Sequence, residues 1–330
     1  MKHVLVIRLS ALGDVALMAP LVHDYAMSNP DIRFTIAGPP LLMALFSGMD
    51  NVEYLRIKKK QSFIKIYKIL NSVGADTVID LHKVNRVGFA LTLLRLRNLF
   101  NFHFRLRALR KGKFSRWLYL HHLYHHPRKP QYQRYDDVFR RAGLKRVENE
   151  KRKTKKSASA NSSTFTIGVA PFSQHKGKIW PWENIGRLVK ILADSGYQVL
   201  LFGGKNEASQ LETLASESVK SLAGKQSFAE ELDIIKSLSL MVSMDSSNMH
   251  FASVLGVPVV SIWGATHPDF GFYPQQQSRD NALCANLSCQ PCSAFGQKAC
   301  RYGDYRCLTA ITPEMVFNKI QSILNQNAHA

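Results

Sequence analysis

An acid, two hydroxyls and a histidine lie close together in the segment 242–274. Asp245, Ser246 and Ser247 follow an apolar run, and His250 lies three residues further on, within a short helical pattern. The apolar runs on both sides predict buried strands, so the acid and the hydroxyls fall at the start of a helix. Backbone N–H groups, the helix dipole and the hydroxyls would favour an anion such as a diphosphate there. The alternative is an N-capped helix with a structural role alone.

A second polar loop separates a predicted strand from a predicted helix in the segment 166–192. The strand ends near Pro171, and Ser173, Gln174 and Lys178 precede a helix that begins around Pro181. A basic loop in this position is a candidate anion site. The alternative for Lys178 is an ordinary solvated charge.

The amino terminus repeats the arrangement of strand, tight loop and helix. The apolar run at 3–7 is followed by Arg8, Ser10, Gly13 and Asp14, and then by a helical pattern. A carboxylate in such a loop can take a proton from a hydroxyl that attacks a substrate, which makes Asp14 a candidate general base. Asp is also a favoured N-cap residue, so a capping role for Asp14 stays open.

An acid follows two glycines at the end of another predicted strand, at 198–204. Glycines allow a backbone to approach a ligand closely, and an acid beyond them suits the hydroxyls of a ribose. Glu207 is therefore a candidate ribose ligand. An exposed acid in the first turn of a helix is the alternative.

In their order along the chain, these motifs resemble glycosyltransferase family 9, the heptosyltransferases. The family's donor signature, D-[ST]-x-x-x-H, A-x-x-x-G-x-P and G-x-T-x-P, is formed here by Asp245, Ser246, His250, Ala252, Gly256, Pro258, Gly264, Thr266 and Pro268. Its amino-terminal pattern R-x-[ST]-x-x-G-D is formed by Arg8, Ser10, Gly13 and Asp14, and its K-x-W-P pattern by Lys178, Trp180 and Pro181. This chain departs from the family at Ser247, where relatives usually carry Gly, the residue with the freest backbone.

The resemblance implies an inverting transferase that moves heptose from ADP-heptose to the lipid A-core acceptor of lipopolysaccharide. Asp14 would be the general base. No metal or other cofactor is expected, so fixed cations and helix N-termini would meet the charge of the leaving nucleotide. His250 would lie beneath the phosphate, and the loop around Gln226 would meet the adenine. The expected donor-binding residues are Ser173, Gln174, Lys178, Glu207, Gln226, Asp245, Ser246, Ser247 and His250.

Length and patterning predict two α/β domains. A chain of 330 residues is too long for one core, and strands alternate with helices in both halves. The resemblance implies the GT-B architecture, with two Rossmann-like domains whose parallel sheets face a central cleft. We expect an acceptor-binding domain at 1–156, a polar linker at 157–164 and a donor-binding domain at 165–310. The last helix, 311–330, can pack back on the first domain.

Positive charge is concentrated in one region. The formal net charge of the chain is +20. Residues 81–160 hold 22 Lys or Arg and four acids, and no acid occurs between Asp80 and Asp136. Leu, Phe, Trp and Tyr are interleaved with the cations, a combination that suits an anionic glycolipid or membrane surface. A solvated basic face and a nucleic-acid site are the alternatives, but no nucleic-acid-binding motif accompanies the region, so no nucleic acid is expected. The expected acceptor-binding residues are Arg8, Ser10, Gly13, Arg105, Arg107, Arg110, Lys111 and Lys113.

The hydropathy of the sequence bears on the cellular location of the protein. The apolar runs are shorter than the ~20 residues of a transmembrane helix, and the first ten residues lack the apolar core of a signal peptide. We therefore expect a cytoplasmic protein that binds the inner face of the inner membrane peripherally.

All five cysteines fall near the end of the chain, at Cys284, Cys289, Cys292, Cys300 and Cys307. The C-x-x-C spacing followed by two further cysteines leaves a zinc site open. In the family such a Cys-rich loop is a structural element, so we expect structural cysteines, reduced or disulfide-linked, and no metal.

Two other functions remain open from the sequence. One is a different GT-B enzyme that uses another nucleotide sugar, or an epimerase of similar architecture. The other is a non-catalytic protein that binds anionic lipid or nucleic acid.

Overall fold

The computed structural model describes residues 1–58, 60–124, 126–147 and 165–328. The chain forms two compact units. Unit 1 comprises Met1–Lys111 and Lys129–Glu150, and unit 2 comprises Gly112–Arg128 and Lys151–Ala330. The expected linker, 157–164, lies outside the described residues.

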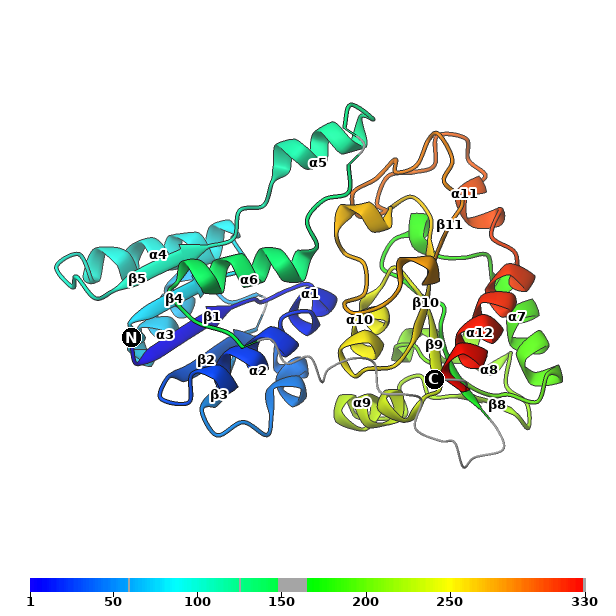
Figure 1. The fold of residues 1–330 in the computed structure, drawn as a ribbon, viewed down its shortest axis with the longest axis horizontal. Helices are drawn as coiled ribbons and strands as arrows, with labels where there is room; N and C mark the ends of the chain where they lie inside the picture. Colours follow the sequence, from blue (N-terminus) through cyan, green and yellow to red (C-terminus); the bar gives the residue numbers. More distant parts are fainter. Residues whose placement is uncertain (59, 125, 148–164, 329–330) are drawn as a thin grey trace. The chain divides into compact units, whose positions relative to one another are not determined.

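Unit 1 is built on a parallel sheet in the order β3-β2-β1-β4-β5 (Figure 1). Its strands are β1 (His3–Ile7), β2 (Arg33–Gly38), β3 (Val52–Arg56), β4 (Thr77–Asp80) and β5 (Arg105–Ala108). The central strand β1 is apolar and buried, and Leu5 pairs with Thr35 on one side and with Val78 on the other. A strand buried on both faces needs such a continuous apolar run, which is why the sequence reveals it.

Helices cover both faces of this sheet. They are α1 (Leu12–Ala16), α2 (Ala19–Ser28), α3 (Phe63–Val73), α4 (Asn85–Arg97) and α6 (Gln131–Arg141), with a 3₁₀ helix η1 (Pro40–Phe46). α3 and α4 pack side by side and share a core with Leu5 and Ile7 of β1. α6 packs against α2, where the rings of Tyr25 and Phe139 stack.

Unit 2 has a second parallel sheet, in the order β11-β10-β9-β6-β7-β8. Its strands are β6 (Thr166–Ala170), β7 (Gln198–Leu201), β8 (Val219–Ser221), β9 (Leu240–Met244), β10 (Val259–Trp263) and β11 (Ala282–Cys284). Its helices are α5 (Lys113–Leu120), α7 (Trp182–Asp194), α8 (Ala208–Glu212), α9 (Phe228–Ser237), α10 (Ser247–Val254), α11 (Arg306–Thr309) and α12 (Pro313–Ala328). The shorter 3₁₀ helices are η3 (Lys176–Lys178), η4 (Lys205–Glu207), η5 (Pro268–Phe270) and η6 (Arg279–Asn281). Two α/β units with parallel sheets confirm the predicted fold class.

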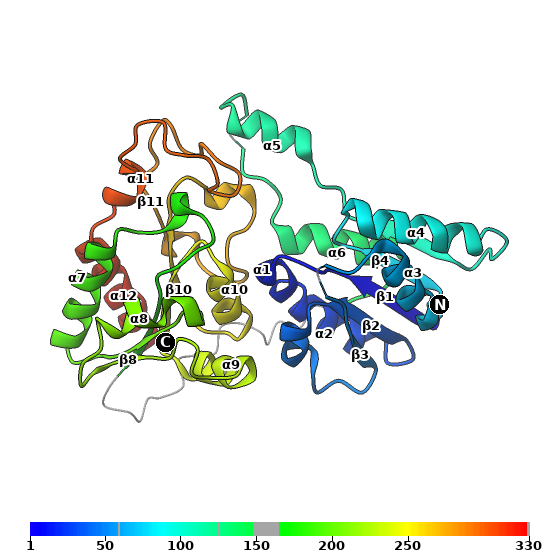
Figure 2. The same cartoon turned by 180° about the vertical axis from the view of Figure 1, so that it is seen from behind.

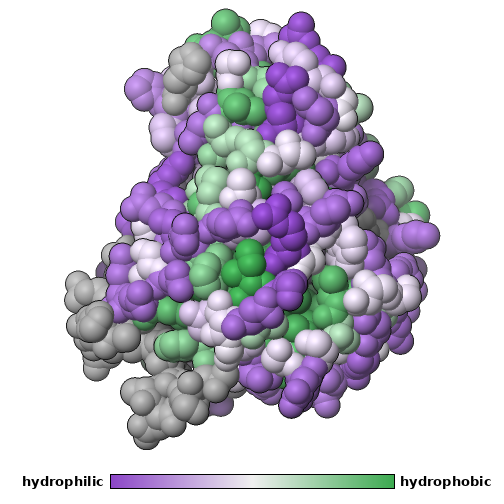
Figure 3. All heavy atoms as spheres, turned by 90° about the vertical axis from the view of Figure 1, so that its right-hand side faces the viewer, coloured by the Kyte–Doolittle hydropathy of each residue, from purple (hydrophilic) through white to green (hydrophobic). Residues whose placement is uncertain are grey.

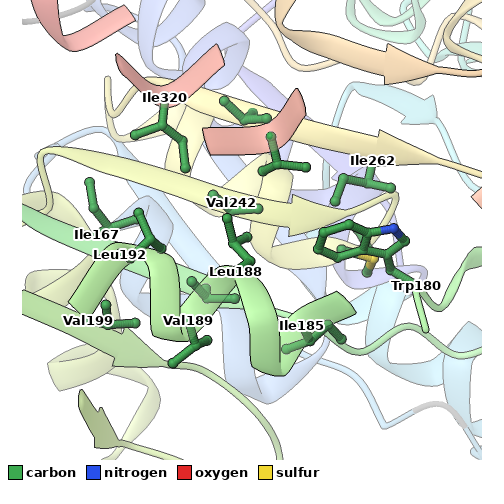
Figure 4. Close-up of a cluster of buried hydrophobic side chains, with 14 of the residues drawn as sticks. Ile167, Trp180, Ile185, Leu188, Val189, Leu192, Val199, Val242, Ile262 and Ile320 are labelled. Atoms are coloured by element: carbon green, nitrogen blue, oxygen red, sulfur yellow. The ribbon is translucent and has the colours of Figure 1, made fainter. Parts of the chain in front are cut away.

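The core of unit 2 joins the carboxyl-terminal helix to the sheet. Figure 4 shows Ile320 of α12 above the sheet residues Val242 and Ile262, with Leu188 of α7 in the same cluster. Trp180 is buried, and its indole N–H donates to the carbonyl of Ile311, 2.9 Å away. The last helix therefore belongs to the core of unit 2, although the sequence led us to expect that it could return to the first domain.

A segment from the first half of the chain also belongs to unit 2. Residues 112–128, which include α5, were expected in the acceptor domain. The Tyr119 hydroxyl donates to Asp269 Oδ2 at 2.8 Å, and the Arg128 N–H donates to the Asp269 carbonyl, also at 2.8 Å. These contacts tie the segment to the residues that follow β10, so it is part of unit 2.

The face of unit 2 that Figure 3 shows is largely polar. Where residues are described, hydrophilic side chains cover most of that face, and the apolar patches among them are small and separate (Figure 3). Helices that bury one side usually present such a surface on the other. Among the described residues, no helix combines the length and the apolar character that crossing a bilayer requires.

Candidate active site

Asp14 lies where the carboxyl end of β1 leads into α1. It occupies the first turn of that helix, while Ala11 stands at the N-cap position. The capping role considered for Asp14 is therefore wrong. Its carboxylate instead forms an ion pair with Arg8 through Oδ2, and Oδ1 accepts a hydrogen bond of 2.9 Å from the Tyr135 hydroxyl. Donors on both oxygens fix the orientation of this carboxylate.

Arg8 and Tyr135 are themselves held firmly. Arg8 is buried and also donates through Nη1 to the carbonyl of Leu81. Burial alone would lower the pKa of Arg8, but the neighbouring acids Asp14 and Asp80 raise it overall, so the guanidinium stays charged. Tyr135 is fully buried, and burial raises the pKa of its hydroxyl, which keeps it a hydrogen-bond donor.

A second polar pair lies at the end of the adjacent strand β4. Asp80 Oδ1 accepts the backbone N–H groups of His82 and Lys83, at 2.9 and 2.8 Å. Burial raises the pKa of the Asp80 carboxyl. Burial, together with the charges of Arg8 and Lys111, lowers the pKa of His82 from 6.5 to about 4. His82 is therefore neutral in the folded protein at neutral pH.

The low pKa of His82 makes stability depend on pH. Between about pH 6.5 and pH 4 the unfolded chain binds a proton at His82 and the folded chain does not, so stability falls as the pH falls. We expect the wild-type protein to lose about 2 kcal/mol across this window that a His82→Gln variant does not lose. Urea unfolding at the two ends of the window measures this difference. The exposed His103→Gln is the control and should behave like wild type; equal losses in wild type and His82→Gln would contradict the prediction.

The structure divides the predicted acceptor-binding residues. Arg8 pairs with Asp14, and Ser10 and Gly13 lie in the same loop and helix start, whereas Arg105 lies at the amino-terminal end of the edge strand β5. Arg107 donates through Nε to the carbonyl of Arg141, at 2.9 Å.

The remaining predicted cations lie beyond β5. Lys111 is close enough to Asp80 and His82 to affect their titration. Arg110 is exposed on unit 1, and Lys113 begins α5 on unit 2. Of the predicted cations, Arg8 pairs with Asp14, and Lys111 lies within electrostatic reach of Asp80.

In unit 2, the carboxyl ends of β6, β9 and β10 bring a second set of side chains together. Lys178 Nζ lies 2.8 Å from Asp245 Oδ2. Thr266 donates to the same oxygen at 2.7 Å, and Ser173 donates to the Asp245 carbonyl at 3.2 Å. Segments far apart in the sequence thus meet at one edge of the sheet, where ligands bind in α/β proteins.

Close backbone packing holds Lys178 in this position. The Ala265 N–H donates to the carbonyl of Gly177, at 2.8 Å, so the loop of η3 lies directly against the end of β10. A Cβ at Gly264 would lie 2.5 Å from the Gly177 carbonyl oxygen, and one at Gly296 would lie 2.7 Å from Cγ of Lys178. A side chain at either glycine would displace the loop that carries the lysine.

The amino terminus of α10 adjoins this cluster. Ser246 stands at the N-cap position in extended conformation, but its side chain accepts no hydrogen bond from the backbone of α10, all of which is described. Its hydroxyl lies 3.2 Å from that of Ser243. The simple N-capped helix is therefore not what forms here. Ser247 begins the helix half-exposed, and His250 is buried within it.

Comparison with known proteins decides the family. The model of glycosyltransferase family 9 (heptosyltransferase) matches residues 65–304. The chain belongs to this family. The resemblance predicted from the motifs is thus confirmed, and both sites just described lie in a family 9 protein.

Curated relatives are heptosyltransferases. The chain is similar to lipopolysaccharide heptosyltransferase 2 of Escherichia coli K12, with 29% identity over 192 residues, 54% of this chain and 52% of the relative. It is 30% identical to the Salmonella typhimurium enzyme of the same name over 181 residues, 51% of this chain and 49% of that one. The chain spans about half the length of these curated relatives.

Solved structures of the family share the fold over the whole chain. The E. coli ADP-heptose lipopolysaccharide heptosyltransferase II aligns with a TM-score of 0.67 at 21% identity, covering 99% of both chains. The glycosyltransferase family 9 protein of Veillonella parvula aligns with a TM-score of 0.71 at 19% identity, covering 98% of both. These similarities confirm the GT-B fold class.

The other residues predicted to bind the donor are not part of the cluster around Lys178. Glu207 folds back on the preceding turn, where Oε2 accepts the Gly204 N–H at 2.5 Å. Gln174 and Gln226 are exposed. Their roles toward a nucleotide stay predictions.

The cysteines form no evident metal site. All five are free, and burial together with the nearby Cys292, Cys289 and Cys300 raises the pKa of Cys307 to about 12. Within the described ranges, no group of three or more His, Cys, Asp or Glu side chains is arranged to hold a metal ion. The described residues therefore do not support the zinc alternative.

Sequence reasoning missed three polar residues of the unit 1 site. Asp80 and His82 follow the apolar run of β4, so the rule that strand ends carry ligand groups could have found them. Tyr135 lies 121 residues from Asp14, its hydrogen-bond partner, and carries no local signal.

Proposed function

We propose that this protein is an inverting, metal-independent glycosyltransferase that transfers heptose from ADP-heptose to the lipid A-core acceptor of lipopolysaccharide. The observation that carries the proposal is the Asp14 carboxylate, held by Tyr135 and Arg8 at a strand end of a family 9 protein. The names of the relatives support the heptose and the lipopolysaccharide acceptor. A relative from E. coli, solved with ADP, supports the nucleotide.

In the proposed reaction Asp14 is the general base. The acceptor hydroxyl attacks the anomeric carbon, and its proton passes to a carboxylate oxygen of Asp14 as the new glycosidic bond forms. The bond between the anomeric carbon and the diphosphate breaks at the same time, and ADP leaves with the electron pair. A single displacement of this kind inverts the anomeric centre. The fixed carboxylate favours catalysis because no rearrangement is needed when the proton moves.

The cluster around Lys178 would stabilise the departing diphosphate. Lys178 supplies a cation, Ser173 and Ser246 supply hydroxyl donors, and the first turn of α10 supplies backbone N–H groups. Together they meet the developing negative charge without a metal. Asp245 holds Lys178 in place before the nucleotide arrives.

The charge of the chain supports the proposed acceptor and location. The acid-free stretch between Asp80 and Asp136 supports an anionic lipid A-core acceptor and attachment to the cytoplasmic face of the inner membrane. Nucleic acid is not expected as a partner.

Calorimetric titration with ADP, UDP and GDP tests the donor, and a transfer assay with ADP-heptose and a deacylated lipid A-core acceptor tests the reaction. We expect selective ADP binding and transfer with inversion, read from the anomeric configuration of the product. Selective binding of UDP or GDP would replace the donor with another nucleotide sugar. If none of the three bound, the non-catalytic alternative would replace the enzyme.

A further inference from the structure

α4 carries apolar side chains on both of its sides. Val87 and Leu94 face inward and are buried in the core of unit 1. Phe89, Leu93 and Leu96 recur at intervals of four and three residues on the opposite side and are exposed. A helix that covers a core normally carries polar residues on its outer side. Phe89 contacts the Phe63 ring of α3, with 6.0 Å between the ring centroids, yet it stays 62% exposed, and Leu96 is 60% exposed, so the outer stripe is available to a partner.

The stripe continues into the connection between α4 and β5. Phe100 and Phe102 are 86% and 95% exposed, and Leu99 beside them is 62% exposed. Figures 1 and 2 show this connection at the end of unit 1, beyond the edge of the sheet. We call these exposed apolar residues the α4 surface; it consists of Phe89, Leu93, Leu96, Leu99, Phe100 and Phe102. Exposed apolar surface of this extent marks an interaction site.

Cations flank the α4 surface. Arg86, Arg95 and Arg97 are all exposed on the same helix. No acid occurs from residue 81 to residue 135, so no nearby acid in the sequence neutralises them. The partner must therefore accept both apolar side chains and positive charge.

We propose that the α4 surface is the docking site for an anionic phospholipid bilayer. Leucine and phenylalanine side chains enter the boundary of the acyl chains, and the arginines lie among the headgroup phosphates. From Phe89 to Leu96 the stripe runs about 10 Å along the helix, which then leads into the exposed phenylalanines. This inference rests on the proposed function, because a lipid-linked acceptor is what brings the enzyme to a membrane. Binding to the bilayer itself can be measured without catalysis.

Two other partners fit less well. A symmetric dimer through the α4 surface would bring Arg95 and Arg97 of two copies together, with no acid of residues 81–135 to pair them. Single-stranded nucleic acid would use the arginines and the rings for phosphate contacts and stacking, but leucines offer bases no stacking surface. A bilayer uses all three residue types.

Co-sedimentation with vesicles tests the proposal. Full-length protein should bind phosphatidylcholine vesicles that contain about one third phosphatidylglycerol and should bind pure phosphatidylcholine much more weakly. The triple variant Leu96→Ser/Phe100→Ser/Phe102→Ser should bind the anionic vesicles at least about tenfold more weakly. These positions are exposed, so the variant keeps its core.

A matched pair of substitutions controls for general loss of apolar surface. Leu41 and Met43 are exposed on η1 of the same unit, and Leu41→Ser/Met43→Ser should bind vesicles like wild type. A tryptophan introduced by Phe102→Trp should show blue-shifted emission on anionic vesicles, while one introduced by Leu41→Trp should not. Equal binding by the triple variant and wild type would overturn the inference.

The same variants separate the competing partners. Self-association that disappears in the triple variant, without vesicle binding, would assign the surface to a second copy. Binding of a single-stranded oligonucleotide with the same dependence, again without vesicle binding, would assign it to nucleic acid. Either result overturns the membrane assignment.

Transfer to a deacylated acceptor in free solution keeps this test apart from the proposed function. The triple variant should transfer at the wild-type rate there. Vesicle binding without transfer would end the proposed function and leave the docking surface in place. Transfer without vesicle binding would overturn the docking surface and leave the proposed function in place.

Discussion

Replacing Asp14 by Asn is expected to lower kcat for heptose transfer by about 10²- to 10⁴-fold, the range attributed to a general base. The amide keeps the size of the carboxylate but cannot accept the proton of the acceptor hydroxyl. Affinity for ADP should stay close to wild type, because the proposed nucleotide-binding residues belong to unit 2. Initial rates at saturating donor, together with calorimetry of ADP, measure the two quantities.

The ion pair with Arg8 offers a structural explanation that must be separated from catalysis. Asn leaves the buried guanidinium without its carboxylate partner, which is destabilising in itself. The free energy of unfolding of Asp14→Asn is therefore measured beside its rate. Asp31 is an exposed acid of the same unit, and Asp31→Asn serves as the control that should keep full activity. A folded Asp14→Asn protein with wild-type kcat would remove Asp14 from the mechanism.

The unit 2 site was predictable because its residues follow strands of one parallel sheet. Ser173 follows β6, Asp245 follows β9 and Thr266 follows β10. Parallel strands bring their carboxyl ends to one edge, so a polar residue just beyond each apolar run falls near the others. Period and position indicated Ser173, Lys178 and Asp245 as polar residues near strand ends, whereas Thr266 was named only through the family signature.

Contacts that depend on how distant elements pack were not predictable in the same way. Tyr135 lies on α6, and only the docking of α6 against the sheet brings its hydroxyl to Asp14. Tyr119 reaches Asp269 only because residues 112–128 leave unit 1 for unit 2. Local periodicity predicts that such helices form but not the neighbour against which they pack.

Which side chains of α4 are exposed could not be predicted from the sequence, for a related reason. The apolar residues of α4 are spread around the whole helix, and such a pattern predicts a helix without telling which side is buried. The structure buries Val87 and Leu94 and leaves Phe89 and Leu96 exposed. The basic and aromatic composition pointed to an anionic surface, but only the exposed fractions identify the residues that would meet it.

Removal of the Lys178 charge is expected to weaken ADP binding by about 10²- to 10³-fold. The change is Lys178→Met, which keeps the length of the side chain. One contribution is the loss of a charge-assisted hydrogen bond to the diphosphate. A second is the buried Asp245 carboxylate, which would lose the cation on Oδ2, keep the hydrogen bond from Thr266 there and repel the incoming phosphates. Calorimetric titration with ADP measures the change.

Lys176→Met is the matched control, because Lys176 is an exposed cation two residues away on the same 3₁₀ helix. It should bind ADP within a few-fold of wild type, since an exposed charge in water contributes little. The double variant Lys178→Met/Asp245→Asn separates the two contributions. If repulsion by Asp245 matters, neutralising it should restore part of the lost affinity; if the direct bond alone matters, the double variant should bind as weakly as Lys178→Met. Wild-type affinity in Lys178→Met would exclude the lysine from the diphosphate site and leave the amino terminus of α10 to hold the anion.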